Sequence, residues 1–487
     1  MSAGHDRFES VAAIPVDRNS GRVYEMGWQS WSPTAVYPVT ATSARPSAPY
    51  FQIFYRPETP APADGFQAEG VLAVAPADGE PVHLFTPSGP PHQVPSIRAR
   101  LVGDVLTVSA NGPVRHTSAR ADLYGALAGF ADEHVASQPA RPLRPVPPVW
   151  ASWYQYFTDF TQQDLTDNLD AMDRLGLPIG VVRIDDAFQA GIGDWLTPSA
   201  RFDSLPGMIT AVTDRGRRAG VWFAPFLVGA DSTLLRAHPE WLVRDAAGTP
   251  VRALHNWDQD CFVLDTTHPG AAAHLHHVFA TYREWGTDYF MIDFLYAGAM
   301  PGRRHDGADP ITAYRAGLAL IRDAIGADAT LQGCGAPMLP SVGYVDTMRV
   351  GADIAAHYPA LHDDLANPGG EAAPVSTIAR AFTHGRFWLN DPDCLLARPG
   401  VQRRQQWAEL VERYGAVRIS SDGLDRLDDW GLAVTRRLLV PSRVEPFAAD
   451  QVPLELPVVQ EALRGRDAPD RPGGRDFVAS LPAGGRP

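Results

Sequence analysis

The chain has 487 residues, and 45% of them are hydrophobic, which is enough for a large core. This length predicts more than one domain, although a barrel can use ~250 residues as a single unit. The formal net charge of -14, without a block of basic residues, argues against a nucleic-acid partner, because such a partner needs a basic surface.

Targeting and redox features of the sequence point to the cytoplasm. No run of 18 apolar residues is present, so we expect no membrane span. The first ten residues are polar and lack the apolar core of a signal peptide. Three widely spaced cysteines, Cys261, Cys334 and Cys394, match neither a disulfide framework nor a zinc spacing. We therefore predict a cytoplasmic protein without a metal site.

The N-terminal part of the chain has the pattern of a β-rich domain. Short strand-like runs at 51–55, 70–75 and 105–110 are separated by Pro, Gly and Asp turns, and a helical pattern follows at 119–135. Five prolines in 137–148 make a stiff segment. We predict a domain over 1–136 and a linker over 137–148.

From Val149 onward, strand-like runs alternate with amphipathic helical patterns. Eight such alternations over about 270 residues predict a (β/α)₈ barrel over 149–439. A doubly wound open sheet is the alternative, but no Gly-rich phosphate fingerprint follows a strand. After Leu439, a Pro-, Gly- and Arg-rich segment, 440–487, predicts a short β segment with a disordered end. The strand runs are 149–155, 179–185, 220–226, 288–293, 329–333, 345–350, 386–389 and 416–420, and the helical patterns are 162–174, 206–218, 270–285, 311–325 and 402–414.

Two carboxylates at predicted strand ends are candidates for catalysis, since a barrel forms its site at the carboxyl ends of its strands. Asp293 ends the apolar run Tyr289–Ile292, and Asp353 follows the run 345–350. Either could be structural, Asp293 as a buried cap and Asp353 as a helix N-cap. Glycoside hydrolysis needs one carboxyl group on each side of the scissile bond.

Other strand ends carry groups suited to a sugar. Asp185 and Asp186 could bind a hard cation or accept hydrogen bonds from hydroxyl groups, and the absence of a calcium-loop pattern favours the hydroxyl interpretation. Trp153, Trp195 and Trp222 could form stacking walls, although a single Trp is more often core packing. Trp222 has the strongest claim because of its place near a strand end.

Several segments together resemble glycoside hydrolase family 36, the α-galactosidase or melibiase family, over residues 20–435. The resemblance implies Asp293 as nucleophile and Asp353 as general acid/base. It further implies that Asp185 and Asp186 bind O4 and O6 of the sugar, Trp222 lines the subsite, Arg349 contacts O2 or O3, and Cys334 flanks the ring. It implies an N-terminal β-sandwich, no cofactor, and a homo-oligomer. The segments are Gly27–Ser32, Trp153-Tyr154, Ile184–Asp186, Gly193–Trp195, Gly220–Trp222, His238–Trp241, Leu264–Pro269, Ile292–Gly298, Gly333–Gly335, Arg349–Asp353 and Leu389–Cys394.

The sequence departs from the family pattern at three places. Met291 stands two residues before Asp293, where the family usually has a sugar-binding Lys. Phe188 replaces the Trp of the usual Asp-Asp-Gly-Trp run, and the C-terminal β segment is short. The first two changes leave the identity of the sugar open, and neither of them removes a catalytic carboxylate.

The sequence therefore predicts a retaining α-glycosidase that hydrolyses terminal galactose-like residues of a glycoside or oligosaccharide. Transglycosylation on the same carboxylates is the second hypothesis. A third hypothesis, to which Met291 gives weight, is a carbohydrate-binding homologue without activity.

Overall fold

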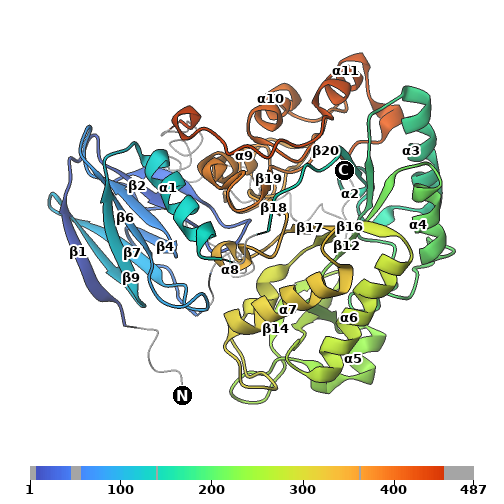
Figure 1. Cartoon of the computed structure of the whole chain (residues 1–487), viewed down its shortest axis with the longest axis horizontal. Coiled ribbons are helices and arrows are strands. Elements are labelled where there is room, and N and C mark those ends of the chain that lie inside the picture. Colours follow the sequence, from blue (N-terminus) through green and yellow to red (C-terminus); the bar gives the residue numbers. More distant parts are fainter. Residues whose placement is uncertain (1–6, 45–55, 57, 139–140, 361–363, 454–487) are drawn as a thin grey trace, which may run out of the picture.

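The computed structural model describes residues 7–44, 56, 58–138, 141–360 and 364–453. Two antiparallel sheets form the N-terminal part, and a parallel barrel wrapped by helices forms the rest (Figure 1). Residues 141–148 contain neither helix nor strand and lead directly into the first barrel strand. We propose the domain boundary in this stretch.

The two N-terminal sheets pack face to face as a β-sandwich. One has the order β1-β8-β7-β4 and the other β3-β2-β5-β6-β9. Alternate residues such as Val74, Phe66 and Ile97 fill the core between them. The strands are β1 (Glu9–Pro15), β2 (Arg22–Glu25), β3 (Ala35–Pro38), β4 (Phe66–Glu69), β5 (Leu72–Ala75), β6 (Val82–Pro87), β7 (Ser96–Val102), β8 (Val105–Ala110) and β9 (Val114–Ala119).

The predicted N-terminal elements agree with these strands where the structure describes the chain. The run 105–110 is strand β8, and the run 70–75 contains β5. A two-residue turn joins β7 to β8, with Gly103 at a φ of 62°, a conformation that Gly adopts without steric cost. The strand predicted at 51–55 lies outside the described residues.

The barrel consists of eight parallel strands in the order β19-β18-β17-β16-β12-β11-β10-β20. Hydrogen bonds from Leu395 to Ile419 and from Ala416 to Asn390 join the segment around β19 to β20 and close the ring. This closure rules out the open, doubly wound sheet and confirms the predicted (β/α)₈ barrel. The strands are β10 (Val149–Ala151), β11 (Val181–Ile184), β12 (Arg218–Phe223), β16 (Thr287–Ile292), β17 (Thr330–Gly333), β18 (Thr347–Arg349), β19 (Leu389–Asp391) and β20 (Ile419–Ser420).

Helices cover the outside of the barrel and one side of the sandwich (Figure 1). Helix α4 ends earlier than predicted, because Gly216 adopts a φ of 70° and Arg218 already begins β12. The α-helices are α1 (Leu123–Ala136), α2 (Trp153–Tyr156), α3 (Gln162–Leu175), α4 (Leu205–Thr213), α5 (Thr233–Ala237), α6 (Pro269–Glu284), α7 (Pro310–Ile325), α8 (Met338–Ser341), α9 (Ala373–Ala379), α10 (Arg404–Tyr414) and α11 (Asp429–Leu438). The 3₁₀ turns are η2 (Phe157–Asp159), η3 (Pro239–Trp241), η4 (Leu295–Ala299), η6 (Ala381–Thr383), η7 (Leu424–Arg426) and η8 (Ala449–Gln451).

An insertion between β12 and α6 forms a small antiparallel sheet of its own. It contains β13 (Leu227–Gly229), β14 (Arg252–Asn256) and β15 (Gln259–Val263). The turn between β14 and β15 consists of Trp257 and Asp258, at φ values of 52° and 54°, as a tight two-residue hairpin requires. The sequence analysis did not predict this hairpin.

The first barrel strand is shorter than predicted. It ends at Ala151, and Trp153 begins helix α2 rather than lying on the strand. Ser152 causes this ending, because its backbone is already helical and its hydroxyl accepts the backbone N–H of Asp185 at 2.9 Å.

The C-terminal segment contributes little to the described fold. Residues 440–453 contain η8 and no strand, and the remainder of the predicted β segment lies outside the described residues. Among the helices that the structure describes, none combines the length and the apolar character needed to cross a membrane.

Candidate active site at the carboxyl ends of the barrel strands

Buried polar side chains gather where the barrel strands end. Asp185 and Asp186 follow β11, Asp293 follows β16, and Arg349 ends β18. Parallel strands of a barrel deliver such residues to one rim. Asp353 lies a few residues beyond β18 and is joined to this rim by an ion pair with Arg349.

Asp293 is a buried carboxylate whose two oxygens are held by different donors. The Trp222 indole donates to Oδ2 at 3.2 Å, and the backbone N–H of Phe294 donates to Oδ1 at 2.7 Å. Phe294 itself adopts a left-handed φ of 51°. Burial raises the pKa of Asp293, while these hydrogen bonds and contact with Cys334 oppose that rise. The carboxylate is thus fixed in orientation.

Asp353 is more exposed than Asp293, with 32% of its side chain accessible. Its Oδ1 accepts a hydrogen bond from Arg349 Nη1 at 2.7 Å. Burial raises the pKa of Asp353 and the charge of Asp293 raises it further, whereas Arg349 and hydrogen bonding from Trp31 lower it. The two carboxyl groups therefore interact electrostatically and lie in different environments.

Arg349 connects Asp353 to two fully buried carboxylates. Its Nη2 donates to Asp393 at 2.5 Å, and its Nε lies 3.5 Å from Asp391. Tyr154 also donates to Asp393. Burial raises the pKa of Asp393 to about 7, although Arg349 opposes the rise. The sequence analysis included both aspartates in the motif Leu389–Cys394 but assigned them no role.

Asp185 and Asp186 are equally buried but have different partners. Arg183 Nε donates to Asp185 at 3.0 Å and forms an ion pair with it. Asp186 accepts from Gln189 and from the Trp257 indole, both at 2.6 Å. Burial raises the pKa of each carboxyl group. Asp185 is thus fixed by an arginine, whereas Asp186 is held by neutral donors.

Aromatic rings surround this group of carboxylates. Trp222 lies 6.1 Å from Trp195 and 6.4 Å from Trp257 between ring centroids, and Trp257 lies 5.4 Å from Phe294. Trp153 is partly buried and packs edge-on against Phe157, 5.2 Å away, in the turn after β10. The rings provide the apolar walls that a sugar ring can contact.

Three further residues from the sequence analysis occupy different places. Cys334 is buried and its thiol contacts the carboxylate of Asp293. Met291 shares the face of β16 with Asp293, because side chains alternate along a strand. Phe188 packs against Phe223 and Tyr282 with no exposed surface, so it belongs to the layer between strands and helices.

A loop of the N-terminal sandwich supplies a wall of the site. Trp31 packs edge-on against Phe294, 5.2 Å between centroids, and lies so close to Gly335 that a Cβ there would meet the indole at 2.9 Å. The buried guanidinium of Arg380 donates to the carbonyl groups of Gln29, Ser30 and Ser32. The sequence analysis quoted 27–32 as a motif but missed Trp31 and Trp257 as site residues, since both arrive from distant segments.

No group of three or more His, Cys, Asp or Glu side chains with a metal-binding arrangement occurs among the described residues. Asp185 and Asp186 are instead engaged by arginine, glutamine and indole donors.

Comparisons with known proteins agree with this architecture. The Melibiase family model matches residues 129–296. A bifunctional α-galactosidase/sucrose kinase of Mediterraneibacter gnavus is 31% identical over 117 residues, 20% of this chain, and an α-galactosidase of Escherichia coli is 31% identical over 87 residues, 16% of this chain. The aligned stretch covers 12% of each of these two relatives.

Solved structures give a match over most of the chain. The α-galactosidase TtGalA of Thermus thermophilus, in a complex with p-nitrophenyl α-D-galactopyranoside, has a TM-score of 0.74 and 28% identity over 92% of both chains. The GH36 α-galactosidase AgaA of Geobacillus stearothermophilus has a TM-score of 0.60 and 14% identity, covering 88% of this chain and 61% of that one, which shows the shared fold alone.

Fold, carboxylate arrangement and matches together define a barrel protein of the glycoside hydrolase class. Within that class, the chain is similar to the α-galactosidases of the Melibiase family, whose model matches residues 129–296.

Proposed function

We propose that this protein is a retaining α-glycosidase that removes terminal α-linked galactose-like residues. The observation that carries the proposal is the pair Asp293 and Asp353 at one rim in different surroundings, Asp293 held by Trp222 and Phe294 and Asp353 held by Arg349. A retaining glycosidase needs two such carboxyl groups, one to attack and one to transfer protons.

Asp293 is the proposed nucleophile. Its orientation by Trp222 and Phe294 leaves the carboxylate fixed for attack on the anomeric carbon, and these donors favour the ionised form against burial. The attack forms a covalent bond between the anomeric carbon and Asp293 while the bond to the leaving oxygen breaks.

Asp353 is the proposed general acid and then general base. It protonates the leaving oxygen in the first step and takes a proton from water in the second, which releases the sugar with its α configuration. Burial and the charge of Asp293 raise its pKa, which favours the protonated form that the first step needs. Its partial exposure gives the aglycone and the incoming water access.

Substrate binding is proposed for the residues around this pair. Asp185 and Asp186 accept hydrogen bonds from sugar hydroxyls, Arg349 donates to them, and Cys334 flanks the ring. Trp222, Trp195, Trp153, Trp257 and Trp31 supply the apolar surface. TtGalA has been seen with stachyose bound, which supports an oligosaccharide substrate here. Met291 bears on specificity because it occupies the face of β16 that carries Asp293.

The test is a product analysis by NMR. Aryl α-galactoside, α-glucoside, α-N-acetylgalactosaminide and β-L-arabinopyranoside are offered, and the first-formed anomer is recorded. We expect α-galactose first and a fall in kcat of about 10⁴-fold or more in Asp293→Ala. In Asp293→Ala, azide should replace the missing carboxylate as the nucleophile of the first step. In Asp353→Ala, azide should replace water in the second step, because it needs no general base. Undiminished turnover in Asp293→Ala, or β-galactose formed first, would refute the proposal.

The same experiment separates the alternatives. Galactosyl transfer to an added sugar in preference to water would indicate a transglycosylase, and binding without turnover would indicate an inactive homologue. A cytoplasmic location and homo-oligomerisation complete the proposal. Three free, buried cysteines support the location, and light scattering on the purified protein would measure the oligomeric state.

A further inference from the structure

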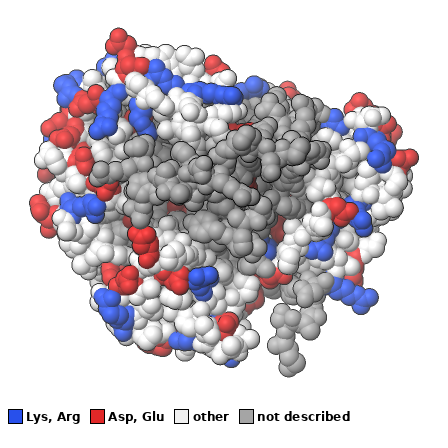
Figure 2. Space-filling view, turned by 180° about the vertical axis from the view of Figure 1, so that it is seen from behind, with Lys and Arg blue, Asp and Glu red and all other residues white. Residues whose placement is uncertain are grey.

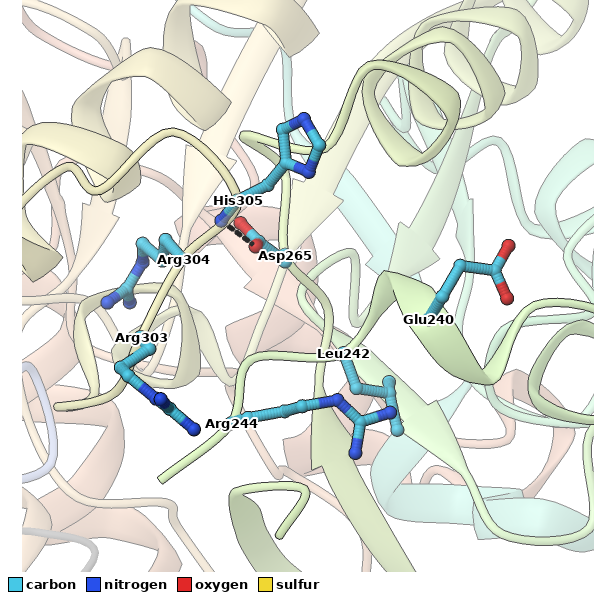
Figure 3. A pocket seen from close by; sticks show the side chains of 7 residues that line it. All are labelled: Glu240, Leu242, Arg244, Asp265, Arg303, Arg304 and His305. Carbon is cyan, nitrogen blue, oxygen red and sulfur yellow. Dashed lines mark hydrogen bonds between the residues drawn. The ribbon is translucent and has the colours of Figure 1, made fainter. Parts of the chain in front are cut away.

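A second pocket lies beside the small insertion sheet, away from the catalytic carboxylates. It has a volume of about 340 Å³ and lies between the segment 240–244, Asp265 and the loop after η4 (Figure 3). Along the chain, the five residues of strand β14 lie between the segment beside this pocket and Trp257. An extended strand of that length spans ~15 Å. Its lining residues are Glu240, Leu242, Arg244, Asp265, Arg303, Arg304 and His305.

Two of the lining arginines face each other across an antiparallel bridge. The backbone N–H of Arg303 donates to the carbonyl of Arg244 at 2.6 Å, and the reverse bond is 3.3 Å. Side chains opposite each other in such a pair lie about 5 Å apart at Cβ, and like charges there destabilise the pair. Figure 3 shows both side chains on the same side of the pocket. The arrangement concentrates positive charge at one point.

No carboxylate in the described part of the chain forms an ion pair with these two arginines. Arg244 donates to the carbonyl groups of Gly248 and Pro239, and Arg303 Nε donates to that of Asp245. Elsewhere on the surface basic and acidic side chains are interspersed, as the described part of the face in Figure 2 shows. The guanidinium charges in this pocket are thus oriented by neutral backbone groups.

Arg304 adds a third, buried guanidinium. It is 8% exposed and donates to the carbonyl groups of Gly298 and Met300 at 3.0 and 2.8 Å. Other buried arginines, such as Arg183 and Arg349, have carboxylates in direct contact. Among the described residues no carboxylate is in ion-pair contact with Arg304, although the charges of Asp265, Asp309 and Asp306 act on it from farther away. Its burial makes an anion in direct contact favourable.

The two carboxylates that line the pocket, Asp265 and Glu240, have partners other than the three arginines. Asp265 accepts from the backbone N–H of His305 through Oδ2 and from Thr267 through Oδ1. Glu240 is 55% exposed and pairs with His238. The pocket is thus lined by three arginines, and Asp265 is the one buried carboxylate among its lining residues.

We propose that Arg244, Arg303 and Arg304 form a binding site for a phosphate group. Guanidinium forks match phosphate oxygens, and a phosphate monoester carries about -1.5 to -2 charges at pH 7. The volume lies at the lower end of the range for small-molecule sites, about 300–1,000 Å³, and accommodates a phosphorylated monosaccharide. The phosphate source is either inorganic phosphate or such a sugar phosphate.

Calorimetric titration of the full chain tests the site. Inorganic phosphate and a hexose 6-phosphate are titrated separately at equal ionic strength, with sodium chloride as the reference salt. The variants are Arg303→Gln, whose exposed position makes it safe for folding, and the double variant Arg244→Gln/Arg303→Gln. The control is Arg252→Gln, an exposed arginine of the same small sheet that pairs with Asp260.

We expect binding of at least one phosphate compound, a Kd at least about tenfold higher in the double variant, and an unchanged Kd in the control. Tighter binding of the hexose 6-phosphate would assign the rest of the cavity to the sugar, and equal binding would assign the site to phosphate alone. Without phosphate, Arg303→Gln should raise Tm because one of two opposed like charges is removed. Heats no larger than those with chloride, or equal affinity in the double variant and the control, would overturn the proposal.

Discussion

Arg349 donates to Asp353 at 2.7 Å and, with another nitrogen, to Asp393 at 2.5 Å. One guanidinium thus links the proposed acid/base to a carboxyl group with no exposed surface. The ionisation of Asp393 must therefore influence that of Asp353, because both respond to the same positive charge.

Asp393→Asn should change how stability depends on pH. The pKa of Asp393 is raised to about 7 in the folded protein, against about 3.9 in an unfolded chain. Below pH 4 both states are protonated, and between pH 4 and 7 only the folded state keeps the proton. The parent protein should therefore lose roughly 2–4 kcal/mol of unfolding free energy relative to the variant as pH rises from 4 to 7.

Urea unfolding of both proteins at pH 4.5 and 7.5 measures this difference. Activity supplies a second readout. Without the charge of Asp393, Arg349 lowers the pKa of Asp353 more strongly, so the basic limb of kcat/KM should move to lower pH. Parallel stability curves and identical pH profiles would contradict the link through Arg349.

Much of this network was predictable from the sequence. Several apolar runs of the barrel end in a polar residue, and parallel strands bring such ends together, so Asp185, Asp293 and Arg349 could be placed at one rim. Trp222 was predicted as well, but two other indoles that contact carboxylates of the site, Trp257 and Trp31, could not be. Trp257 reaches Asp186 from a hairpin inside an insertion, and Trp31 crosses from the sandwich. The hydrophobic periodicity of a local segment does not show that a side chain from a distant segment, such as Trp257 or Trp31, contacts the site.

The boundaries that sequence patterns missed have local physical causes. The first barrel strand was expected to reach residue 155, yet the hydroxyl of Ser152 accepts a hydrogen bond from the backbone of Asp185 and helix α2 begins at once. Phe188 was expected to bear on the choice of sugar because the family usually has Trp in its place. Its burial against Phe223 and Tyr282 shows that a residue two positions after Asp186 can point into the opposite layer.

Trp257→Phe should weaken substrate binding more than it slows the reaction. The indole donates to Asp186 at 2.6 Å, a hydrogen bond to a charged group of the kind worth about 1.5–3 kcal/mol. If Asp186 binds sugar hydroxyls, its loss of orientation should raise KM about tenfold with a small change in kcat. Steady-state kinetics on an aryl α-galactoside measure the two constants separately.

Trp285→Phe is the matched control for that variant, since Trp285 packs on Tyr282 at the end of α6. Its kinetic constants should equal those of the parent protein. An equal fall of kcat and kcat/KM in Trp257→Phe would instead mean that the indole acts only in the transition state.

Trp31→Phe should move the pH profile in the direction opposite to Asp393→Asn. Phe keeps an aromatic ring against Phe294 but removes the hydrogen bonding that lowers the pKa of Asp353. The pKa of Asp353 should rise, so the basic limb of kcat/KM should extend to higher pH. Trp28→Phe, in the same loop but stacked beneath Arg56, should leave the limb in place. A common shift in both variants would indicate a general loosening of the loop.

Arg380→Met should destabilise the protein and reduce activity together. Arg380 has no exposed surface, and its guanidinium donates to the carbonyl groups of Gln29, Ser30, Ser32 and Val350. Methionine removes these four buried hydrogen bonds, so the unfolding free energy should fall by about 3–5 kcal/mol. Val350 adjoins Arg349 and the loop carries Trp31, so kcat/KM should fall in the fraction that remains folded.

Arg380→Lys separates charge from geometry. Lysine restores a positive charge but lacks the planar fork that reaches several carbonyl groups at once. We expect stability between that of the parent and the methionine variant, with Trp31 poorly held and activity still reduced. Full stability and activity in Arg380→Lys would mean that a cation at this position is sufficient, and that the fork does not place the N-terminal loop over the active site.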